Sequence, residues 1–257
     1  MSTQLDPVPQ PAEGTPYGQT VEPERWVPRP WFKRWEDDEF TPRGPLNVGA
    51  GLLRAQGAVA RDLFSDRNLN TYIAGCGLIM VFASLLYGAI LGSVGGAGQV
   101  AYAAIKFPVV IVGACGICLP SFYVFQALTG ARLSLKQAVA SVLMLGAAAG
   151  LILLGCAPIA WFFSVSTTED AGAFLGLMHA VIIALSTTFG FHFITRTHRY
   201  VAWKHGERLF DGRVLALWFV LLVLVAAQMA SYLGPLDTDR GMLETRRGFF
   251  LSALFEV

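Results

Sequence analysis

The stretch that decides the fold runs from Phe107 to Ala131 and reads FPVVIVGACGICLPSFYVFQALTGA. It contains 25 residues and no charged side chain, and it is bounded by Lys106 and Arg132. A helix that crosses the hydrocarbon core of a bilayer needs about 20 apolar residues. The stretch therefore predicts a membrane-spanning helix, which the rest of the chain either repeats or anchors.

The composition of the whole chain is also typical of a membrane protein. Of its 257 residues, 54% are hydrophobic and only 14% are charged, with a mean hydropathy of +0.52. Soluble domains carry about 25% charged residues. The net charge of +1 combines acidic and basic residues that crowd into residues 1–67, 196–213 and 237–257. We expect neither a soluble globular domain nor a nucleic-acid partner.

Five apolar segments have the length that a bilayer core requires. They lie at 71–93, 107–128, 137–164, 171–195 and 214–233. The predicted fold class is an all-α integral membrane protein with a five-helix transmembrane bundle over residues 68–235. The glycine-rich interval 94–104 predicts an outer loop or a short re-entrant segment.

Basic residues gather before the first span and in alternate loops after it. They are Arg54, Arg61, Arg67, Arg132, Lys136, Arg196, Arg199, Lys204, Arg208 and Arg213. The positive-inside rule places the N-terminus in the cytoplasm and the C-terminus outside. The N-terminus has no basic segment followed by an apolar run, so we expect the first span to act as the insertion signal.

The N-terminal residues 1–45 are rich in proline and poor in aliphatic side chains, which predicts a disordered cytosolic tail. Within it, aromatic residues lie among basic ones and precede four acids; they include Trp26, Trp31, Phe32 and Trp35. One interpretation is a patch at the lipid headgroups, and the other is a motif that docks on a protein partner. The acidic residues weaken the lipid interpretation because anionic headgroups would repel them.

Amphipathic segments flank the spans. In residues 46–67, Leu52, Val59 and Leu63 recur near helical spacing, which predicts a juxtamembrane helix on the membrane surface. Residues 236–257 predict an outer tail with a second short amphipathic helix. The basic loop after the fourth span, with Arg196, Arg199, Lys204 and Arg208, either sets topology alone or contacts lipid or a partner.

Three glycine pairs have the four-residue spacing that lets membrane helices approach closely. They are Gly88 with Gly92, Gly146 with Gly150, and Gly172 with Gly176. We interpret them as packing residues within the monomer, with a subunit interface as the alternative.

Few groups suggest chemistry. His179 and Gln228 fall at similar depth and could pair or hold a polar ligand, and an interhelical hydrogen bond is the simpler interpretation. Cys115 and Cys118 have redox spacing, but the four cysteines fall at different depths, so we expect apolar packing and no metal. The predicted spans contain no charged side chain, which argues against a coupled transporter. We find no hydrolase or phosphate-loop motif and expect no enzyme and no cofactor.

A family resemblance accompanies four short stretches. They are Leu119–Phe125 (LPSFYVF), the following GARLSLKQ, Ala157-Pro158-Ile159 and Ala227-Gln228-Met229. Together they are similar to bacterial multi-pass proteins grouped with the Yip-type five-span membrane proteins. The resemblance covers 46–250 and implies five helices, a cytosolic N-terminal tail and a bacterial inner-membrane location, but no chemistry. Residues 233–236 read LGPL where that group has an Arg-Pro-Phe element.

Three functions follow as hypotheses. The first is a non-enzymatic membrane scaffold or accessory subunit that recruits a partner through its cytosolic tail. The second is a homo-oligomeric channel or facilitator for a small solute. The third is a quinone-binding or redox accessory subunit that uses the two close cysteines with His179 and Gln228.

Overall fold

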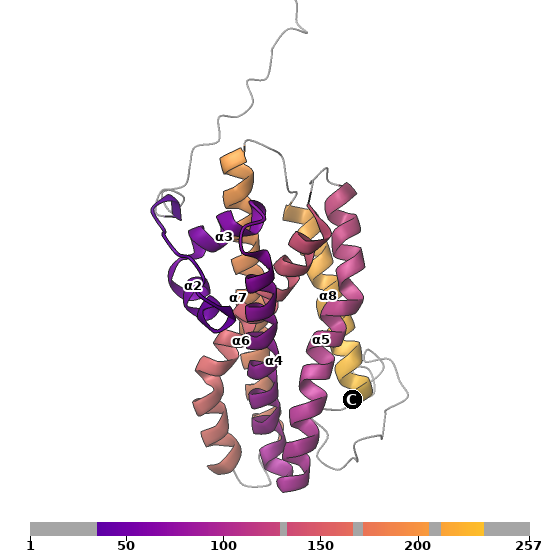
Figure 1. Cartoon of the computed structure of the whole chain (residues 1–257). Coiled ribbons are helices and arrows are strands. Elements are labelled where there is room, and N and C mark those ends of the chain that lie inside the picture. The colour runs from indigo at the N-terminus through magenta and orange to yellow at the C-terminus, as the bar shows by residue number, and fades with distance from the viewer. Residues whose placement is uncertain (1–34, 129–132, 167–171, 206–211, 234–257) are drawn as a thin grey trace, which may run out of the picture.

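The computed structural model describes residues 35–128, 133–166, 172–205 and 212–233, whose regular structure is helical. The 3-10 turn η1 (Pro45–Asn47) and the short helices α2 (Val48–Arg54) and α3 (Gln56–Phe64) come first. The long helices are α4 (Leu69–Gly92), α5 (Ala97–Leu128), α6 (Leu135–Ser166), α7 (Gly172–His205) and α8 (Gly212–Leu233), with the 3-10 turn η2 (Ser93–Gly95) after α4 (Figure 1). All five are long and apolar enough to cross a membrane.

Two of the long helices extend beyond the predicted spans. α5 begins at Ala97, ten residues early, and α7 ends at His205, ten residues late. The interval predicted as a loop or re-entrant segment is therefore η2 followed by the first turns of α5. A span predicted from hydropathy stops near the first charged residue. A helix can continue past that residue, because its hydrogen bonds join backbone groups and do not depend on the side chain. Lys106 consequently lies inside α5, just before the predicted span 107–128, and is 5% exposed.

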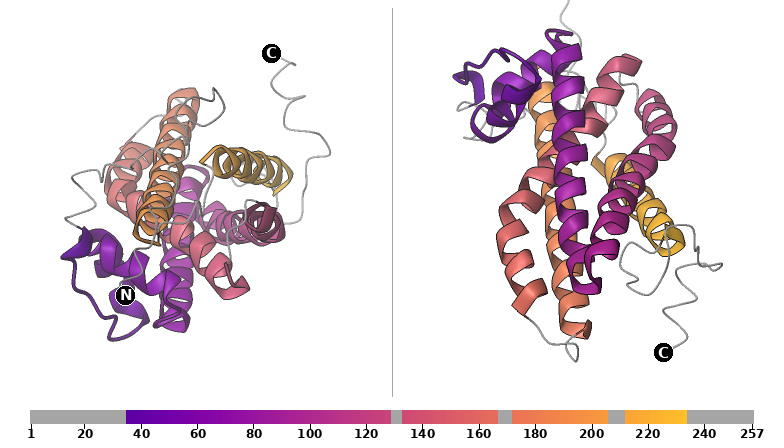
Figure 2. Two further views of the ribbon diagram at one scale, coloured as in Figure 1. Left: turned by 90° about the horizontal axis from the view of Figure 1, so that it is seen from above. Right: turned by 60° about the horizontal axis from the view of Figure 1, so that its bottom comes forward.

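The long helices form a bundle in which α4 is central. α4 packs against α5 on one side and α6 on the other, α7 packs on α6, and α8 packs on α5 (Figure 2). Successive helices reverse direction, so α4, α6 and α8 begin at the end where α5 and α7 finish. We call this the basic end, because Arg67, Lys136, Lys204 and Arg213 lie within two residues of the helix termini found here.

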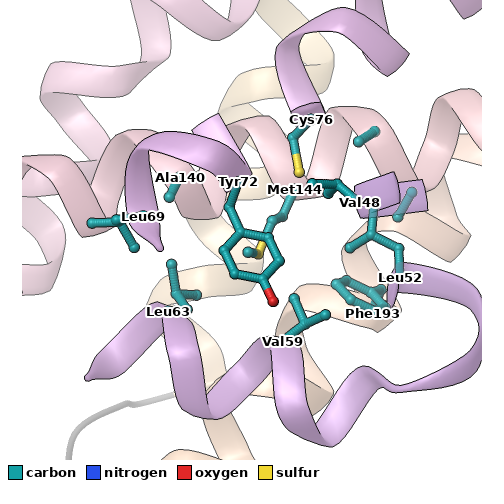
Figure 3. Close-up of a cluster of buried hydrophobic side chains, with 12 residues drawn as sticks. Val48, Leu52, Val59, Leu63, Leu69, Tyr72, Cys76, Ala140, Met144 and Phe193 are labelled. Atoms are coloured by element: carbon teal, nitrogen blue, oxygen red, sulfur yellow. The ribbon is translucent and has the colours of Figure 1, made fainter. Parts of the chain in front are cut away.

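The segment predicted as one surface helix over 46–67 is divided. α2 and α3 meet at Ala55, whose backbone (φ −135°, ψ 55°) is not helical, and α3 is followed by a turn. Their apolar side chains, Val48, Leu52, Val59 and Leu63, are almost fully buried. Figure 3 shows these side chains around Tyr72 of α4, with residues of α6 and α7 completing the cluster. Tyr72 donates its hydroxyl to Oδ2 of Asp62 at 3.1 Å.

Two of the three predicted glycine pairs lie at helix contacts. A Cβ on Gly88 would lie 2.5 Å from the Ala103 carbonyl oxygen of α5, and Gly92 makes the same kind of close approach to Gln99. Gly146 and Gly150 of α6 face side chains of α4: a Cβ on Gly146 would clash with the Met80 side chain, and one on Gly150 would lie 2.9 Å from the Ala83 Cβ. Small residues here allow the helices to approach closely without cavities.

The third glycine pair has no such role in the described chain. A Cβ on Gly172 or Gly176 would meet no atom within 4 Å. Instead, α7 packs on α6 through Gly190, whose Cβ would lie 2.6 Å from the Leu145 carbonyl oxygen. Gly190 has no glycine partner four residues away, so the spacing rule does not find it.

Candidate functional site

Arg61 on α3 joins the segment before α2 to the end of α7. Its Nη1 donates to the carbonyl oxygen of Trp35 at 2.5 Å and to the hydroxyl of Tyr200 at 3.3 Å. Its Nη2 donates to the carbonyl oxygen of Asp38. A guanidinium group suits this arrangement because its donors point in several fixed directions within one plane.

A second set of contacts holds the same segment. The backbone N–H of Gly57 donates to Oδ2 of Asp38 at 2.9 Å. A Cβ on Gly57 would lie 2.1 Å from the carbonyl oxygen of Trp35, so only glycine fits at this position. We call the group of Trp35, Asp38, Gly57, Arg61 and Tyr200 the Arg61 clamp.

The Trp35 side chain is an integral part of the clamp. It is 6% exposed, and its ring lies 5.4 Å from the Tyr200 ring in an edge-to-face arrangement. The guanidinium carbon of Arg196 lies 5.4 Å from the Trp35 ring centroid, within the range of a cation–π contact. Two residues predicted from distant segments to contact lipid or a partner therefore contact each other.

The other predicted contact residues divide into two groups. Arg199 and Lys204 follow on α7 and are exposed at the basic end. Trp26, Trp31, Phe32 and Arg208 lie outside the described residues, as do the tail over 1–34 and the predicted helix in 236–257. From residue 35 onward the predicted disordered tail is packed on the bundle, because Arg61 binds its backbone. From the sequence, Arg61 was predicted as a topological charge on the polar side of the juxtamembrane helix, and no pattern pointed to Gly57 or Tyr200.

His179 forms a second polar site, at the other end of the bundle. Its Nδ1 lies 3.0 Å from the Tyr87 hydroxyl, and its Nε2 lies 3.2 Å from Oγ of Ser164. The three side chains come from α7, α4 and α6 and are at most 5% exposed. The interhelical hydrogen bond is thus present, but with Tyr87 and Ser164. The predicted partner Gln228 is on α8, which packs mainly on α5.

The cysteines pack as small apolar residues. Cys115 and Cys118 are buried free thiols in a cluster that also contains Phe122 and Trp218. Trp218 of α8 donates Nε1–H to the carbonyl oxygen of Cys118 at 3.0 Å, beside Pro120. This bond fixes α8 to α5 near the point where proline removes a backbone donor.

The described residues contain no group of three His, Cys, Asp or Glu side chains that could hold a metal ion. No family model, curated protein or solved structure matches the chain significantly. The geometry alone therefore defines the class: an all-helical bundle with five candidate membrane spans and a clamped segment at its basic end. The Yip-type resemblance stays a prediction from the residues quoted above.

Proposed function

We propose that the chain is a multi-pass integral membrane protein that acts as a non-enzymatic scaffold or accessory subunit. Insertion into a bilayer is supported by large apolar side chains on the outward faces of all five long helices. Phe82, Ile117, Phe162, Leu177 and Leu217 are each between 61% and 66% exposed. A soluble monomer rarely exposes contiguous apolar surface on this scale to water. In a bilayer the same side chains contact lipid tails, which are equally apolar.

The orientation follows from the distribution of charge. Arg54, Arg67, Lys136, Arg199 and Lys204 all lie at the basic end. Under the positive-inside rule this end faces the cytoplasm, with the N-terminus inside and the C-terminus outside. The membrane we propose is a bacterial inner membrane, as the Yip-type resemblance implies.

The Arg61 clamp is the observation that supports a scaffold. It fixes the chain at Trp35, the first described residue, and the aromatic and basic residues of 1–34 precede this point in the sequence. Arg196 touches that point, and Arg199 and Lys204 follow it on α7. A partner that binds residues 1–34 can also bind the basic residues of α7. Once the first contact has formed, the second is intramolecular, so its effective concentration is raised.

A pull-down tests the scaffold. The tagged chain would be purified in a mild detergent and in nanodiscs, with partners identified by mass spectrometry and the complex weighed by native mass spectrometry. Three forms are compared with the full chain: one lacking residues 1–34, Arg61→Gln and the control Arg54→Gln. We expect a stoichiometric partner that is lost on truncation, weakened by Arg61→Gln and retained by the control. Binding that persists without residues 1–34, or a protein that is always alone, would contradict the proposal.

The two other hypotheses stay predictions. For a channel, the glycine pairs of α4 and α6 are engaged in helix contacts. For a quinone or redox site, both ring nitrogens of His179 are bonded within the chain.

A further inference from the structure

A polar pocket at the basic end is separate from both the Arg61 clamp and the His179 site. It has a volume of about 540 Å³, is open to the surface and lies between the turn after α3 and the start of α6. Its lining residues are Asp66, Asn68, Leu69, Asn70, Thr71, Ser134 and Lys136. The volume is in the range of small-molecule sites.

The turn that forms one wall has an unusual backbone. Asp66 and Asn68 both have positive φ angles, 54° and 55°, in the left-handed region. Aspartate and asparagine tolerate this region better than other non-glycine residues. Asn68 precedes α4 without capping it through its side chain, which leaves that amide available to a ligand.

Hydrogen bonds hold this turn against α6. Ser134 and Gln137 form a reciprocal capping box, in which each backbone N–H donates to the other's side chain. Gln137 also donates Nε2–H to the carbonyl oxygen of Phe64, the last residue of α3, at 3.3 Å. The two walls are therefore joined through Gln137 and maintain a fixed spacing.

The pocket presents one acidic and one basic side chain. Asp66 can accept hydrogen bonds from an ammonium group, and Lys136 can bind a phosphate. The hydroxyls of Thr71 and Ser134 and the amides of Asn68 and Asn70 add neutral donors and acceptors.

We propose that this pocket binds a phosphoethanolamine group, in which a phosphate and a primary ammonium lie two carbons apart. The source is either an ethanolamine phospholipid or a soluble phosphoethanolamine. Thr71 and Lys136 lie within two residues of the starts of the candidate spans that begin at Leu69 and Leu135, where the proposed membrane insertion would bring lipid headgroups. The lipid source rests on the proposed membrane insertion but not on the recruitment of a partner.

Native mass spectrometry from nanodiscs tests the lipid source. The discs would contain equal amounts of phosphatidylethanolamine, phosphatidylcholine and phosphatidylglycerol. We expect the ethanolamine lipid to be retained preferentially, because a choline headgroup has no N–H to donate to Asp66 and a glycerol headgroup has no cation. Asp66→Asn should reduce this preference about tenfold, as expected for one charge-assisted hydrogen bond, whereas Lys136→Gln should weaken retention of all three lipids, because each of them carries the phosphate.

The variants suit the site. Asparagine accepts the left-handed backbone at position 66, so Asp66→Asn removes the charge without straining the turn. Arg67→Gln is the matched control, since it removes a charge from the same turn without touching the pocket lining. Equal retention of the three lipids by the unmodified chain would overturn the lipid source, and equal effects of Arg67→Gln and Asp66→Asn would overturn the assignment to this pocket.

A second measurement separates the two sources. Soluble phosphoethanolamine or phosphocholine would be titrated onto the detergent-solubilised protein, and the shift in thermal unfolding recorded. A shift with phosphoethanolamine alone, together with no lipid preference, supports the soluble source. No shift and no lipid preference overturns both sources. Incorporation into nanodiscs is scored independently, so a failure of membrane insertion is distinguished from a failure of the pocket.

Discussion

At the level of single residues, buried and half-buried polar side chains connect segments that are distant in the sequence. Arg61 joins the N-terminal segment to α7, and His179 joins α4 to α6. In an apolar setting, an enclosed polar group that loses its partner costs more than the net value of the bond. Both residues should therefore be sensitive to substitution.

Arg61→Gln should release the N-terminal segment. The variant loses the charged donors to the carbonyl oxygens of Trp35 and Asp38, and hydrogen bonds to charged groups contribute about 1.5–3 kcal/mol each. We expect the Trp35 region to become cleavable by protease and the free energy of unfolding to fall by about 3 kcal/mol, the lower bound for two such bonds, because the site is only partly buried. Arg54→Gln, on an exposed site, serves as the control. An unchanged cleavage pattern would contradict the clamp.

A double-mutant cycle tests the partner of His179. Tyr87→Phe and His179→Ala should be coupled by about 0.6–1.7 kcal/mol, the range of interhelical hydrogen bonds in membranes. The cycle of His179→Ala with Gln228→Leu should give a coupling energy near zero. The measurement is unfolding in mixed detergent micelles. A larger coupling to Gln228 than to Tyr87 would favour the pair predicted from the sequence.

At the level of helices, backbone proximity decides which contacts are tight. α4 approaches α5 at Gly88 and Gly92 and approaches α6 at Gly146 and Gly150. α8 is instead held in the bundle by side chains along one face, namely Leu215, Trp218 and Leu222. Only 17% of its apolar stretch is buried. The interfaces of α4 should therefore be intolerant of added volume.

Gly88→Ala should destabilise the bundle although alanine favours a helix. Its Cβ would lie 2.5 Å from a backbone oxygen of α5, so the helices must separate. We expect a loss of about 1–3 kcal/mol, as for overpacking. Gly77→Ala on the same helix is the matched control: its Cβ meets nothing within 4 Å, and it should gain up to about 1 kcal/mol. Equal effects of both changes on detergent unfolding would refute this packing.

Trp218→Phe should loosen α8. Phenylalanine keeps most of the apolar contact with Phe122, whose ring centroid lies 4.6 Å away, but it cannot donate to the Cys118 carbonyl oxygen. We expect a loss of about 1 kcal/mol and faster proteolysis after α8. The control is Leu217→Phe, because Leu217 is 62% exposed. Proteolysis rates that match between the two variants would argue against the hydrogen bond.

At the level of the whole molecule, charge and apolar surface divide along the bundle axis. The basic end carries α2, α3 and the clamp, whereas Lys106 is the described charge closest to the opposite end. This polarity is the basis of the proposed orientation.

Reporter fusions in bacterial cells should verify that orientation. A fluorescent protein at the N-terminus should be fluorescent, and alkaline phosphatase at the C-terminus should be active, because that enzyme matures outside the cytoplasm. Moving the phosphatase into the loop between α5 and α6 should abolish its activity. Active phosphatase in that loop would place the basic end outside.

The sequence by itself determined the helical class, the five long apolar helices and their alternating direction. These properties depend on local composition and on the placement of charges such as Lys136 and Arg213, and both can be read along the chain. The apolar positions of residues 46–67 were also predictable: Leu52 of α2 and Val59 and Leu63 of α3 are all buried, although they lie on two helices and not on one.

The tertiary structure alone decided which residues meet. His179 bonds Tyr87 rather than Gln228, and Gly190 is packed while Gly176 is open, because helix rotation and neighbour order set these contacts. Neither quantity is encoded in local spacing. For the same reason Trp35, in a segment that looks unfolded by composition, is buried: its stabilising partners, Arg61 and Tyr200, lie 26 and 165 residues further along the chain.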